Sequence, residues 1–221
     1  GELVSFITYI TQIMMALIMM SFFFMQLLRG SASVSRIVEI LETESEIKED
    51  CNPLKEVKDG SIIFRNVSFI YPGSKEKTLK NINFGIKSGE VLGIIGSTGS
   101  SKSTLVQLIP RLYDTTEGSV NVGGEDVKRY HIETLRDNVA FVLQNNTLFS
   151  GTIRSNMKWG NENASDDEII KALRQSQAWE FVSKYKDGLD HKVEQRGDNF
   201  SGGQKQRLTI ARALLKSPKI I

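Results

Sequence analysis

The sequence predicts an α/β protein preceded by one membrane-spanning helix, on three observations. Residues 3–28 contain no charged side chain and form an apolar run long enough to cross a bilayer. Short β-rich runs alternate with turns at residues 61–90, and helical patterns dominate at about 150–200. Between them, an apolar run at 91–95 leads through a Gly-rich loop into a helix start at Lys102. We expect a central, mainly parallel sheet to carry this loop, with the antiparallel strands and the helical insertion beside it.

Residues 1–47 are expected to be a transmembrane helix and its cytosolic extension. A signal peptide is the alternative, but it requires a basic start, a shorter apolar core and a small-residue cleavage site, whereas Glu2 is acidic. Arg29 and Arg36 follow the apolar run, and because basic residues flank the cytoplasmic side of a span, we expect the rest of the chain in the cytoplasm. The helix is expected to continue through four apolar residues at helical spacing: Val34, Ile37, Val38 and Leu41.

Residues 48–59 are expected to be a linker, because this polar stretch contains Pro53 and ends at Gly60. The globular domain is then expected at 60–221. A net charge of +2 argues against a strongly basic nucleic-acid-binding protein, so no nucleic-acid partner is expected. The single cysteine, Cys51, permits neither an intramolecular disulfide nor a zinc site, and we interpret it as an incidental thiol.

Within the domain, turn residues separate β-rich runs, and two later segments have helical patterns. The expected strands are 62–64, 67–70, 82–86, 118–122 and 139–143, with a tight turn at Gly123 and Gly124. The expected helices are 165–176, 179–184 and 208–215, and 219–221 is expected to begin a buried strand. Ser165 can cap the first of these helices, because three acidic residues follow it in the turn where the helix dipole favours anions.

The loop after the apolar run at 91–95 is typical of a P-loop, the phosphate cradle of ATP- and GTP-hydrolysing proteins. Its backbone N–H groups can surround phosphates, and the following helix adds a partial positive charge. Lys102 would reach the β- and γ-phosphates, and the Ser103 hydroxyl would bind Mg²⁺. The alternative is an ordinary Gly/Ser-rich turn. The candidate phosphate-binding residues are Gly96, Ser97, Thr98, Gly99, Ser100, Ser101, Lys102, Ser103 and Thr104.

Ser101 stands where this loop normally has glycine. Glycine is used where φ is positive or where the backbone approaches a ligand closely. A Cβ in the left-handed region costs roughly 1–2 kcal/mol. Ser101 therefore predicts either a strained loop or a crowded phosphate.

A second candidate anion site is formed by Ser201, Gly202, Gly203 and Gln204, small residues that open a helix. Taken alone, it could be a helix N-cap with a flexible lead-in. Together with the P-loop upstream, it makes the chain resemble the ABC transporter family, specifically exporters in which a membrane domain and its ATPase are fused. The family signature is Leu-Ser-Gly-Gly-Gln, and Phe200 occupies the Leu position.

This resemblance implies a P-loop NTPase nucleotide-binding domain with an antiparallel β-subdomain and a helical subdomain, preceded by one transmembrane helix. It implies that Tyr71 stacks on adenine, and that Lys102 and Gln144 act in catalysis, with Gln144 contacting Mg²⁺ and the attacking water. It also implies that Glu194, Arg196 and Gly197 communicate with the membrane domain; a solvated charged loop is the alternative. The residues implied to contact the γ-phosphate held by a partner's P-loop are Ser201, Gly202, Gly203 and Gln204.

In this family, the Asp that holds the metal ion and the catalytic Glu lie on the strand after the signature helix. Lys219-Ile220-Ile221 resembles the beginning of that strand. Neither carboxylate is present, so we expect truncation before these Walker B carboxylates and an inactive fragment of an active ATPase. His131 and His191 both precede the signature, so neither matches the family's switch histidine.

The function implied is that of an ATP-binding subunit of an exporter, using ATP and Mg²⁺. The implied partners are a second half-transporter, in a homo- or heterodimer, membrane lipid, and a small-molecule, lipid or peptide substrate. The parent is expected to be a multi-pass protein of the cell membrane, with its nucleotide-binding domain in the cytoplasm. Two alternatives stay open: a non-hydrolysing regulatory subunit of a heterodimer, favoured by Ser101, and a cytosolic P-loop protein, opposed by residues 3–28.

Overall fold

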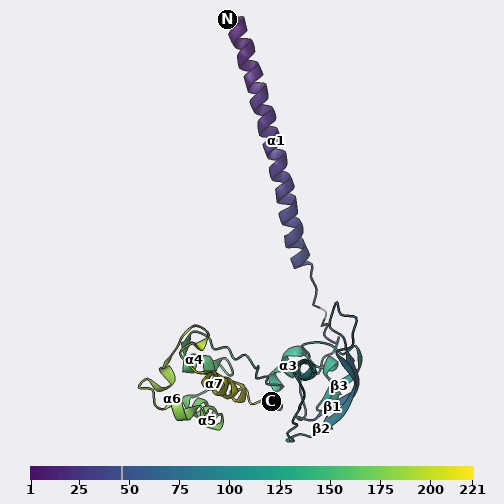
Figure 1. Ribbon diagram of the computed structural model, residues 1–221, viewed down its shortest axis with the longest axis vertical. Helices are drawn as coiled ribbons and strands as arrows, with labels where there is room; N and C mark the ends of the chain where they lie inside the picture. Colours follow the sequence, from purple (N-terminus) through teal and green to yellow (C-terminus); the bar gives the residue numbers. More distant parts are fainter. Residues whose placement is uncertain (46) are drawn as a thin grey trace. The chain divides into compact units, whose positions relative to one another are not determined.

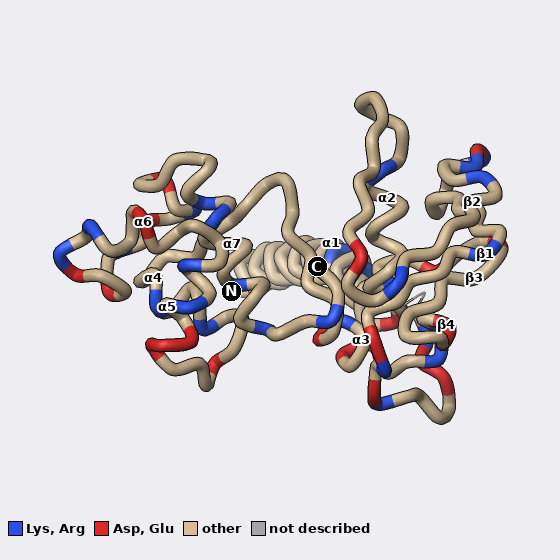
Figure 2. Tube along the Cα trace, turned by 90° about the horizontal axis from the view of Figure 1, so that it is seen from below, with Lys and Arg blue, Asp and Glu red and all other residues tan. Residues whose placement is uncertain are grey.

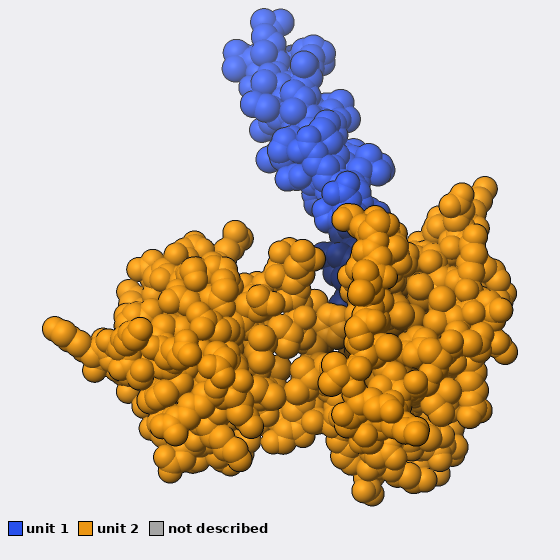
Figure 3. Space-filling view, turned by 60° about the horizontal axis from the view of Figure 1, so that its bottom comes forward, with its two compact units in different colours: residues 1–48 blue, residues 49–221 orange. Residues whose placement is uncertain are grey.

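The computed structural model describes residues 1–45 and 47–221, which form two compact units, residues 1–48 and 49–221 (Figures 1 and 3). The first unit is one helix, α1 (Glu2–Leu41), and none of its residues is buried within the protein. At 1.5 Å per residue, its 40 residues measure about 60 Å, twice the ~30 Å hydrocarbon core of a bilayer. The helix is therefore long and apolar enough to cross a membrane and to continue beyond it.

Three hydroxyl side chains in the apolar part of α1 are hydrogen-bonded within the helix. The hydroxyls of Thr8, Thr11 and Ser21 donate to the backbone carbonyls four residues earlier, at 2.8, 2.7 and 3.0 Å. A hydroxyl bonded in this way adds little cost to the burial of a helix in hydrocarbon, where an unpaired polar group is expensive. The polar residues of α1 are thus compatible with a membrane-spanning helix.

The second unit contains two lobes, each with its own hydrophobic core (Figure 1). The first lobe is an antiparallel sheet with strand order β2-β1-β3-β4. Its strands are β1 (Ile62–Phe69), β2 (Leu79–Ile86), β3 (Glu117–Val122) and β4 (Glu125–Asp126). Helices α2 (Lys102–Gln107) and α3 (Ile132–Asn138) and the 3₁₀ turn η1 (Val127–Arg129) complete this sheet lobe.

The first residues of β1 and the last residues of β3 alternate between buried and less buried positions. Phe64, Val67 and Val120 are almost fully buried in one cluster, which also receives Leu108 and Leu135 from the helical segments. The predicted strands 62–64 and 67–70 are one strand, bent at a register shift beside Asn66, whose φ is +49°. The tight turn predicted at Gly123 and Gly124 is confirmed: both have positive φ and connect β3 to β4.

The second lobe is mainly helical and corresponds to the predicted insertion. Its helices are α4 (Ile153–Lys158), α5 (Asp166–Gln175), α6 (Trp179–Val182) and α7 (Gly202–Leu215). Its short elements are β5 (Gly151–Thr152), β6 (Lys192–Val193), η2 (Gly188–Asp190) and η3 (Gln195–Gly197). The helix predicted at 165–176 is confirmed as α5, whereas the one predicted at 208–215 begins earlier, at Gly202, with Ser201 as its N-cap.

The central parallel sheet that we expected is not formed in the described part of the chain. Residues 91–95 and 140–143 are not strands, and Val91 and Ile95 are 98% and 99% exposed. The remaining parallel pairing is two isolated bridges, Leu54 with Tyr130 and Val139 with Ile220. Parallel strands are stable when covered on both faces and flanked by partners, and residues 91–95 have neither.

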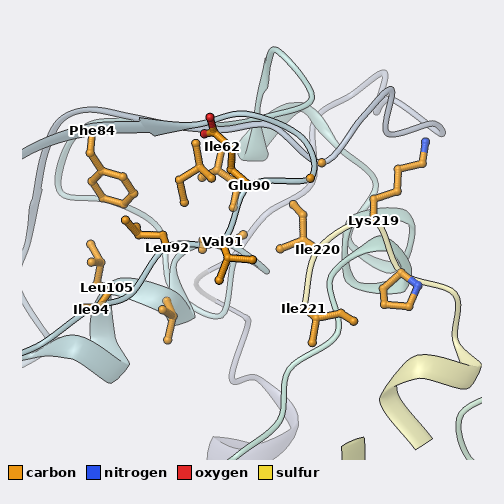
Figure 4. Close-up of a pocket in the computed structure, with 16 residues that line it drawn as sticks. Ile62, Phe84, Glu90, Val91, Leu92, Ile94, Leu105, Lys219, Ile220 and Ile221 are labelled. Carbon is orange, nitrogen blue, oxygen red and sulfur yellow. The ribbon is translucent and has the colours of Figure 1, made fainter. Parts of the chain in front are cut away.

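A cavity of ≈ 390 Å³ lies where this parallel layer was expected (Figure 4). Val91, Leu92 and Ile94 run along it, between Ile62 and Phe84 of the sheet and Leu105 of α2. Its other wall includes Ile220 and Ile221. The apolar side chains of the predicted strand therefore line open space instead of packing in a core.

The expected linker at 48–59 packs onto the sheet lobe along part of its length. Val57 is 1% exposed and belongs to the hydrophobic core. The Leu54 N–H donates to the Arg129 carbonyl at 2.8 Å, and a Glu49 carboxylate oxygen accepts from the Ile132 N–H at 3.0 Å. Apolar residues within a polar stretch are thus enough to attach this segment to the sheet.

Candidate functional site

The phosphate loop precedes α2 and has the backbone conformation that its glycine pattern predicts. Gly99 has φ +84°, and Ser101, the N-cap of α2, has φ +61° and ψ +22°. Ser101 therefore occupies the left-handed region that favours glycine. This agrees with the prediction made from the glycine that normally stands at this position of the loop. At Gly96 a Cβ would lie 2.6 Å from Ser100 Oγ, so a side chain there would require the Ser100 side chain to move.

Lys102 folds back over this loop. Its ammonium donates to the carbonyl oxygens of Gly96 and Ser97, at 2.9 and 2.8 Å, and to Ser100 Oγ at 3.2 Å. All three acceptors are solvent-exposed loop atoms. Phosphate oxygens bear more charge than these acceptors and would form stronger hydrogen bonds to the ammonium. The arrangement therefore holds a positive charge where the sequence predicts the β- and γ-phosphates.

The neighbours of Lys102 on α2 differ in exposure. Ser103 is exposed, so its hydroxyl is accessible to a metal ion beside the phosphates, whereas Thr104 is buried. The exposed loop residues that could bind phosphate are Ser97, Thr98, Gly99 and Ser100. These residues fit a Mg²⁺–triphosphate group in charge, in donor chemistry and in accessibility.

Tyr71 lies two residues beyond the end of β1 and contacts the helix of the phosphate loop. Its hydroxyl and Thr104 Oγ1 are 2.9 Å apart and share a hydrogen bond. Phe69 and Tyr113 pack against its ring in T-shaped geometry, with centroids 4.8 and 5.2 Å away. The structure thus brings the predicted adenine-stacking residue to the phosphate loop, a juxtaposition that sequence spacing alone did not reveal.

Gln144 is exposed in an irregular segment, not at the end of a strand as we expected. The reason is the missing parallel layer: residues 140–143, which were to form that strand, have no ladder partner beyond the bridge at Val139. No described contact joins the Gln144 side chain to Lys102 or Ser103. Its proposed contact with Mg²⁺ therefore stays a prediction.

The second anion motif opens α7 with a capping box. Ser201 Oγ accepts from the Gln204 N–H at 3.3 Å, and Gln204 Oε1 accepts from the Ser201 N–H at 2.9 Å. A Cβ built on Gly202 or Gly203 would meet nothing within 4 Å, so the space above this helix N-terminus is open. The motif is a well-formed N-cap, and its exposed turn also leaves room for an anion.

The two anion motifs belong to different lobes of the second unit. Figures 1 and 2 show α7 with the helical lobe, and Figure 2 shows α2 with the sheet lobe. Lys102 belongs to the segment packed on the sheet core, whereas Phe200 and Leu208, which flank the second motif, are buried in the helical core. Within this chain the two motifs therefore do not form one site.

The segment before the second motif forms η3. Gly197 is buried with φ +67°, and Arg196 is exposed with φ +57°. Glu194 is also exposed, and its backbone N–H donates to Asn199 Oδ1 at 3.1 Å. Glu194 and Arg196 are thus accessible to another protein. Their exposure fits a solvated charged loop equally well.

The cysteine and histidines do not join these motifs. Cys51 is an exposed free thiol. His131 lies 3.7 Å from Glu49, and His191 stacks on Tyr185 with a ring distance of 3.7 Å. Among the residues that the structure describes, no group of three His, Cys, Asp or Glu side chains could hold a metal ion.

An exposed aromatic pair lies close to the Gln144 segment, and the sequence reading did not single it out. Phe149 and Trp159 are 47% and 69% exposed, with ring centroids 4.8 Å apart. Beside them is a groove of ≈ 300 Å³, and the Arg212 guanidinium lies 5.8 Å from the Phe149 ring centroid. Burial lowers the pKa of Arg212. Two large aromatic residues among mainly polar neighbours are the signal in the sequence that could have indicated this exposed aromatic pair.

Comparison with protein families identifies a match over most of the second unit. The family model described as "ABC transporter" matches residues 79–221. The chain is 44% identical over its whole length to the uncharacterized ABC transporter ATP-binding protein YfiB of Bacillus subtilis, and covers 38% of that protein. It is 40% identical over 199 residues to ABC transporter B family member 13 of Arabidopsis thaliana, with 88% of the chain aligned and 16% of the relative. The chain thus spans well under half the length of these curated relatives.

A solved structure shows the same architecture. The structure of a bacterial Atm1-family ABC exporter with ATP bound matches with a TM-score of 0.79 and 32% identity. The match covers 86% of this chain and 33% of that one. The predicted fold class, an ABC-type nucleotide-binding domain with antiparallel and helical subdomains preceded by a candidate membrane helix, is therefore confirmed.

Proposed function

We propose that this chain, which belongs to the ABC transporter family, is the ATP-binding part of an exporter that couples ATP binding and hydrolysis to substrate export. The family assignment provides an ATP-binding domain and an exporter-like fold. The observation that carries the proposal is the loop before α2, with Ser101 at φ +61° and the Lys102 ammonium held over it. This loop offers the positive charge of Lys102, and its exposed Gly-rich backbone can turn N–H groups toward a triphosphate.

Different residues would bind the different parts of Mg²⁺–ATP. Lys102 would exchange its loop acceptors for β- and γ-phosphate oxygens, and the Ser103 hydroxyl would hold the metal ion. Tyr71 would stack on adenine, since an aromatic face binds a base at little conformational cost. Mg²⁺ would neutralise charge on the phosphates, and Gln144 would contact it and orient water. We propose that the Asp that holds the metal ion and the Glu that activates water for hydrolysis are not among the residues named here.

The second anion motif would act on the nucleotide of another subunit. Its position in the helical lobe, away from Lys102, supports a dimer in which each ATP lies between one phosphate loop and the partner's Ser201 motif. Gly202 and Gly203 leave the N-terminus of α7 open for such a contact. The proposed partner is a second half-transporter, identical or related.

The membrane part of the proposal is supported by α1. We propose that α1 is one span of a multi-pass membrane protein, with the second unit in the cytoplasm because Arg29 and Arg36 follow the apolar run. The exposed side chains of Leu143, Phe149 and Trp159 near Gln144 support a protein contact at that face. Gln144, Glu194 and Arg196 would transmit nucleotide binding to the membrane domain, which would export a small molecule, lipid or peptide.

The affinity of the detergent-solubilised chain for MgATP tests the nucleotide site. We expect Lys102→Ala to weaken binding about tenfold or more in isothermal titration, because a charge-assisted contact to phosphate is lost. Lys184→Ala is the matched control, since Lys184 is an exposed lysine of the helical lobe. Equal affinities of wild type, Lys102→Ala and Lys184→Ala would contradict the assignment.

A second candidate function is a regulatory subunit that binds ATP without hydrolysing it. Ser101 supports it, because it places a β-carbon at a left-handed position of the phosphate loop. ATPase rates of the longer protein, purified with its partner, distinguish the two. Hydrolysis at the site containing Ser101 supports the exporter ATPase, and hydrolysis at the partner's site alone supports the regulatory subunit.

A further inference from the structure

The ring of Tyr71 is fixed by three neighbours from different segments. Phe69 belongs to β1, Thr104 belongs to α2, and Tyr113 follows α2 in the chain. Thr104 binds the Tyr71 hydroxyl, and the rings of Phe69 and Tyr113 lie at 80° and 86° to the Tyr71 ring. Phe69 and Tyr113 also contact each other, with centroids 5.5 Å apart. The three aromatics form one cluster, which we call the Tyr71 cluster.

The Tyr71 cluster connects the adenine position to the phosphate position. Thr104 is 6% exposed and lies two residues after Lys102 on the same helix. Tyr113 is half-buried and packs against the sheet core, so it cannot move independently of that core. Tyr71 itself is half-buried, and its aromatic neighbours meet it in T-shaped rather than stacked geometry. Tyr71 is therefore partly exposed, so that a base could reach it, while its neighbours restrict its orientation.

We propose that Tyr113 is a positioning residue for the nucleotide base: with Thr104 it holds Tyr71 at a set place relative to Lys102, so that adenine and triphosphate are recognised together. This inference rests on the proposed ATP-binding function. Tyr113 does not touch the nucleotide and acts through Tyr71. Without this support the Tyr71 ring would sample several orientations in the free chain, and part of the stacking free energy would be spent on ordering it when a base binds.

The test compares MgATP with magnesium tripolyphosphate, which lacks base and ribose, on the detergent-solubilised chain. Tyr113→Leu removes the aromatic contact and is expected to weaken MgATP binding about three- to tenfold, with unchanged tripolyphosphate affinity. Tyr113→Phe keeps the ring and is expected to retain the wild-type affinity for both. A merely structural role of Tyr113 would instead weaken both ligands together through a loosened loop.

A second variant tests the proposal independently of any packing defect. Tyr71→Phe keeps the ring and removes the hydroxyl that binds Thr104, so we expect a smaller loss, about two- to fivefold, for MgATP alone. Tyr185→Leu is the matched control, because Tyr185 makes T-shaped contacts to Phe181 and Phe200 in the helical lobe. We expect it to change stability while the ratio of the two affinities stays constant.

The outcomes separate this proposal from the one it rests on. Parallel losses for both ligands in Tyr113→Leu, or no loss for either, would overturn the positioning role while leaving nucleotide binding intact. Equal wild-type affinities for MgATP and tripolyphosphate would also overturn it, because no base would then be recognised. A wild-type chain that binds neither ligand would overturn the proposed function as well.

Discussion

Ser101 shows how one residue can satisfy a backbone requirement at a cost. Its φ of +61° is the conformation for which the loop usually has glycine, and the chain adopts it with a β-carbon present. The next residue, Lys102, still reaches three oxygen acceptors across the loop. The serine therefore strains the loop, while Lys102 keeps its contacts across it.

Replacing this serine with glycine should relieve the strain. We expect Ser101→Gly to raise the free energy of unfolding by about 0.5–1 kcal/mol, the left-handed penalty less the greater entropy of an unfolded glycine. Urea denaturation of the two proteins measures the difference. We expect MgATP affinity to change less than about threefold, because the loop is already formed.

The control for this prediction is Ser183→Gly. Ser183 is an exposed C-cap residue with φ −64°, so glycine there should destabilise the protein. If both substitutions destabilise equally, Ser101 carries no strain. If Ser101→Gly instead tightens MgATP binding by an order of magnitude, the serine blocks the loop and the regulatory function gains support.

At the scale of elements, a capping box begins α4, α5 and α7, and the last two of these helices differ in proposed role. Ser165 opens α5 and Ser201 opens α7. Ser165→Ala and Ser201→Ala should each lower stability by about 1 kcal/mol, because each loses one capping hydrogen bond. Only Ser201→Ala should slow ATP hydrolysis by the assembled longer protein. Equal hydrolysis rates in the two variants would mean that Ser201 only caps α7 and does not act on the nucleotide.

Arg154 connects three elements of the helical lobe. From α4, its guanidinium donates to Asp190 of η2 at 2.9 and 3.0 Å and also to Asp166 of α5. These hydrogen bonds lower the pKa of Asp190 and raise that of Arg154. Because both carboxylates are more than half exposed, solvent screening keeps the contribution of each pair modest.

The lowered pKa of Asp190 gives this contribution a defined pH dependence. A folded-state pKa below the unfolded value stabilises the protein above the ordinary Asp pKa of about 4, and the stabilisation disappears as pH falls through the folded value. Arg154→Met should therefore lower the melting temperature by a few degrees at pH 7, and the difference from wild type should shrink below about pH 4. A difference that is constant with pH would show that packing, not charge, holds these elements.

The sequence predicted helices and antiparallel strands better than parallel ones, for a physical reason. The cap at Ser165, the turn at Gly123 and the alternation in β1 act locally, so a short window of residues contains the information. Residues 91–95 and 139–143 depend on neighbours distant in sequence, and among the described residues their strand pairing is limited to the bridge of Val139 with Ile220. The positive φ of Gly99 and Ser101 was predictable because the conformation of this loop is local, whereas the contact of Tyr71 with Thr104 required the folded chain.

At the scale of the whole molecule, we expect α1 to hold the protein in a membrane. We expect the 221-residue chain to stay in the membrane pellet after alkaline carbonate extraction and to need detergent for release, because α1 exposes an apolar surface all round. Residues 49–221, a separate compact unit, should be released into the supernatant. Carbonate release of the whole chain would contradict a spanning role for α1.

The location of bound nucleotide tests the central claim most directly, namely that this chain binds ATP between Tyr71 and the loop of Lys102. Photolabelling with 8-azido-ATP and Mg²⁺, followed by tryptic peptide mapping, places the base on the sequence. We predict ATP-protected label on the tryptic peptide of residues 66–75, which contains Tyr71, and its loss in Lys102→Ala. Label confined to another peptide, or label that excess ATP does not displace, would contradict this account.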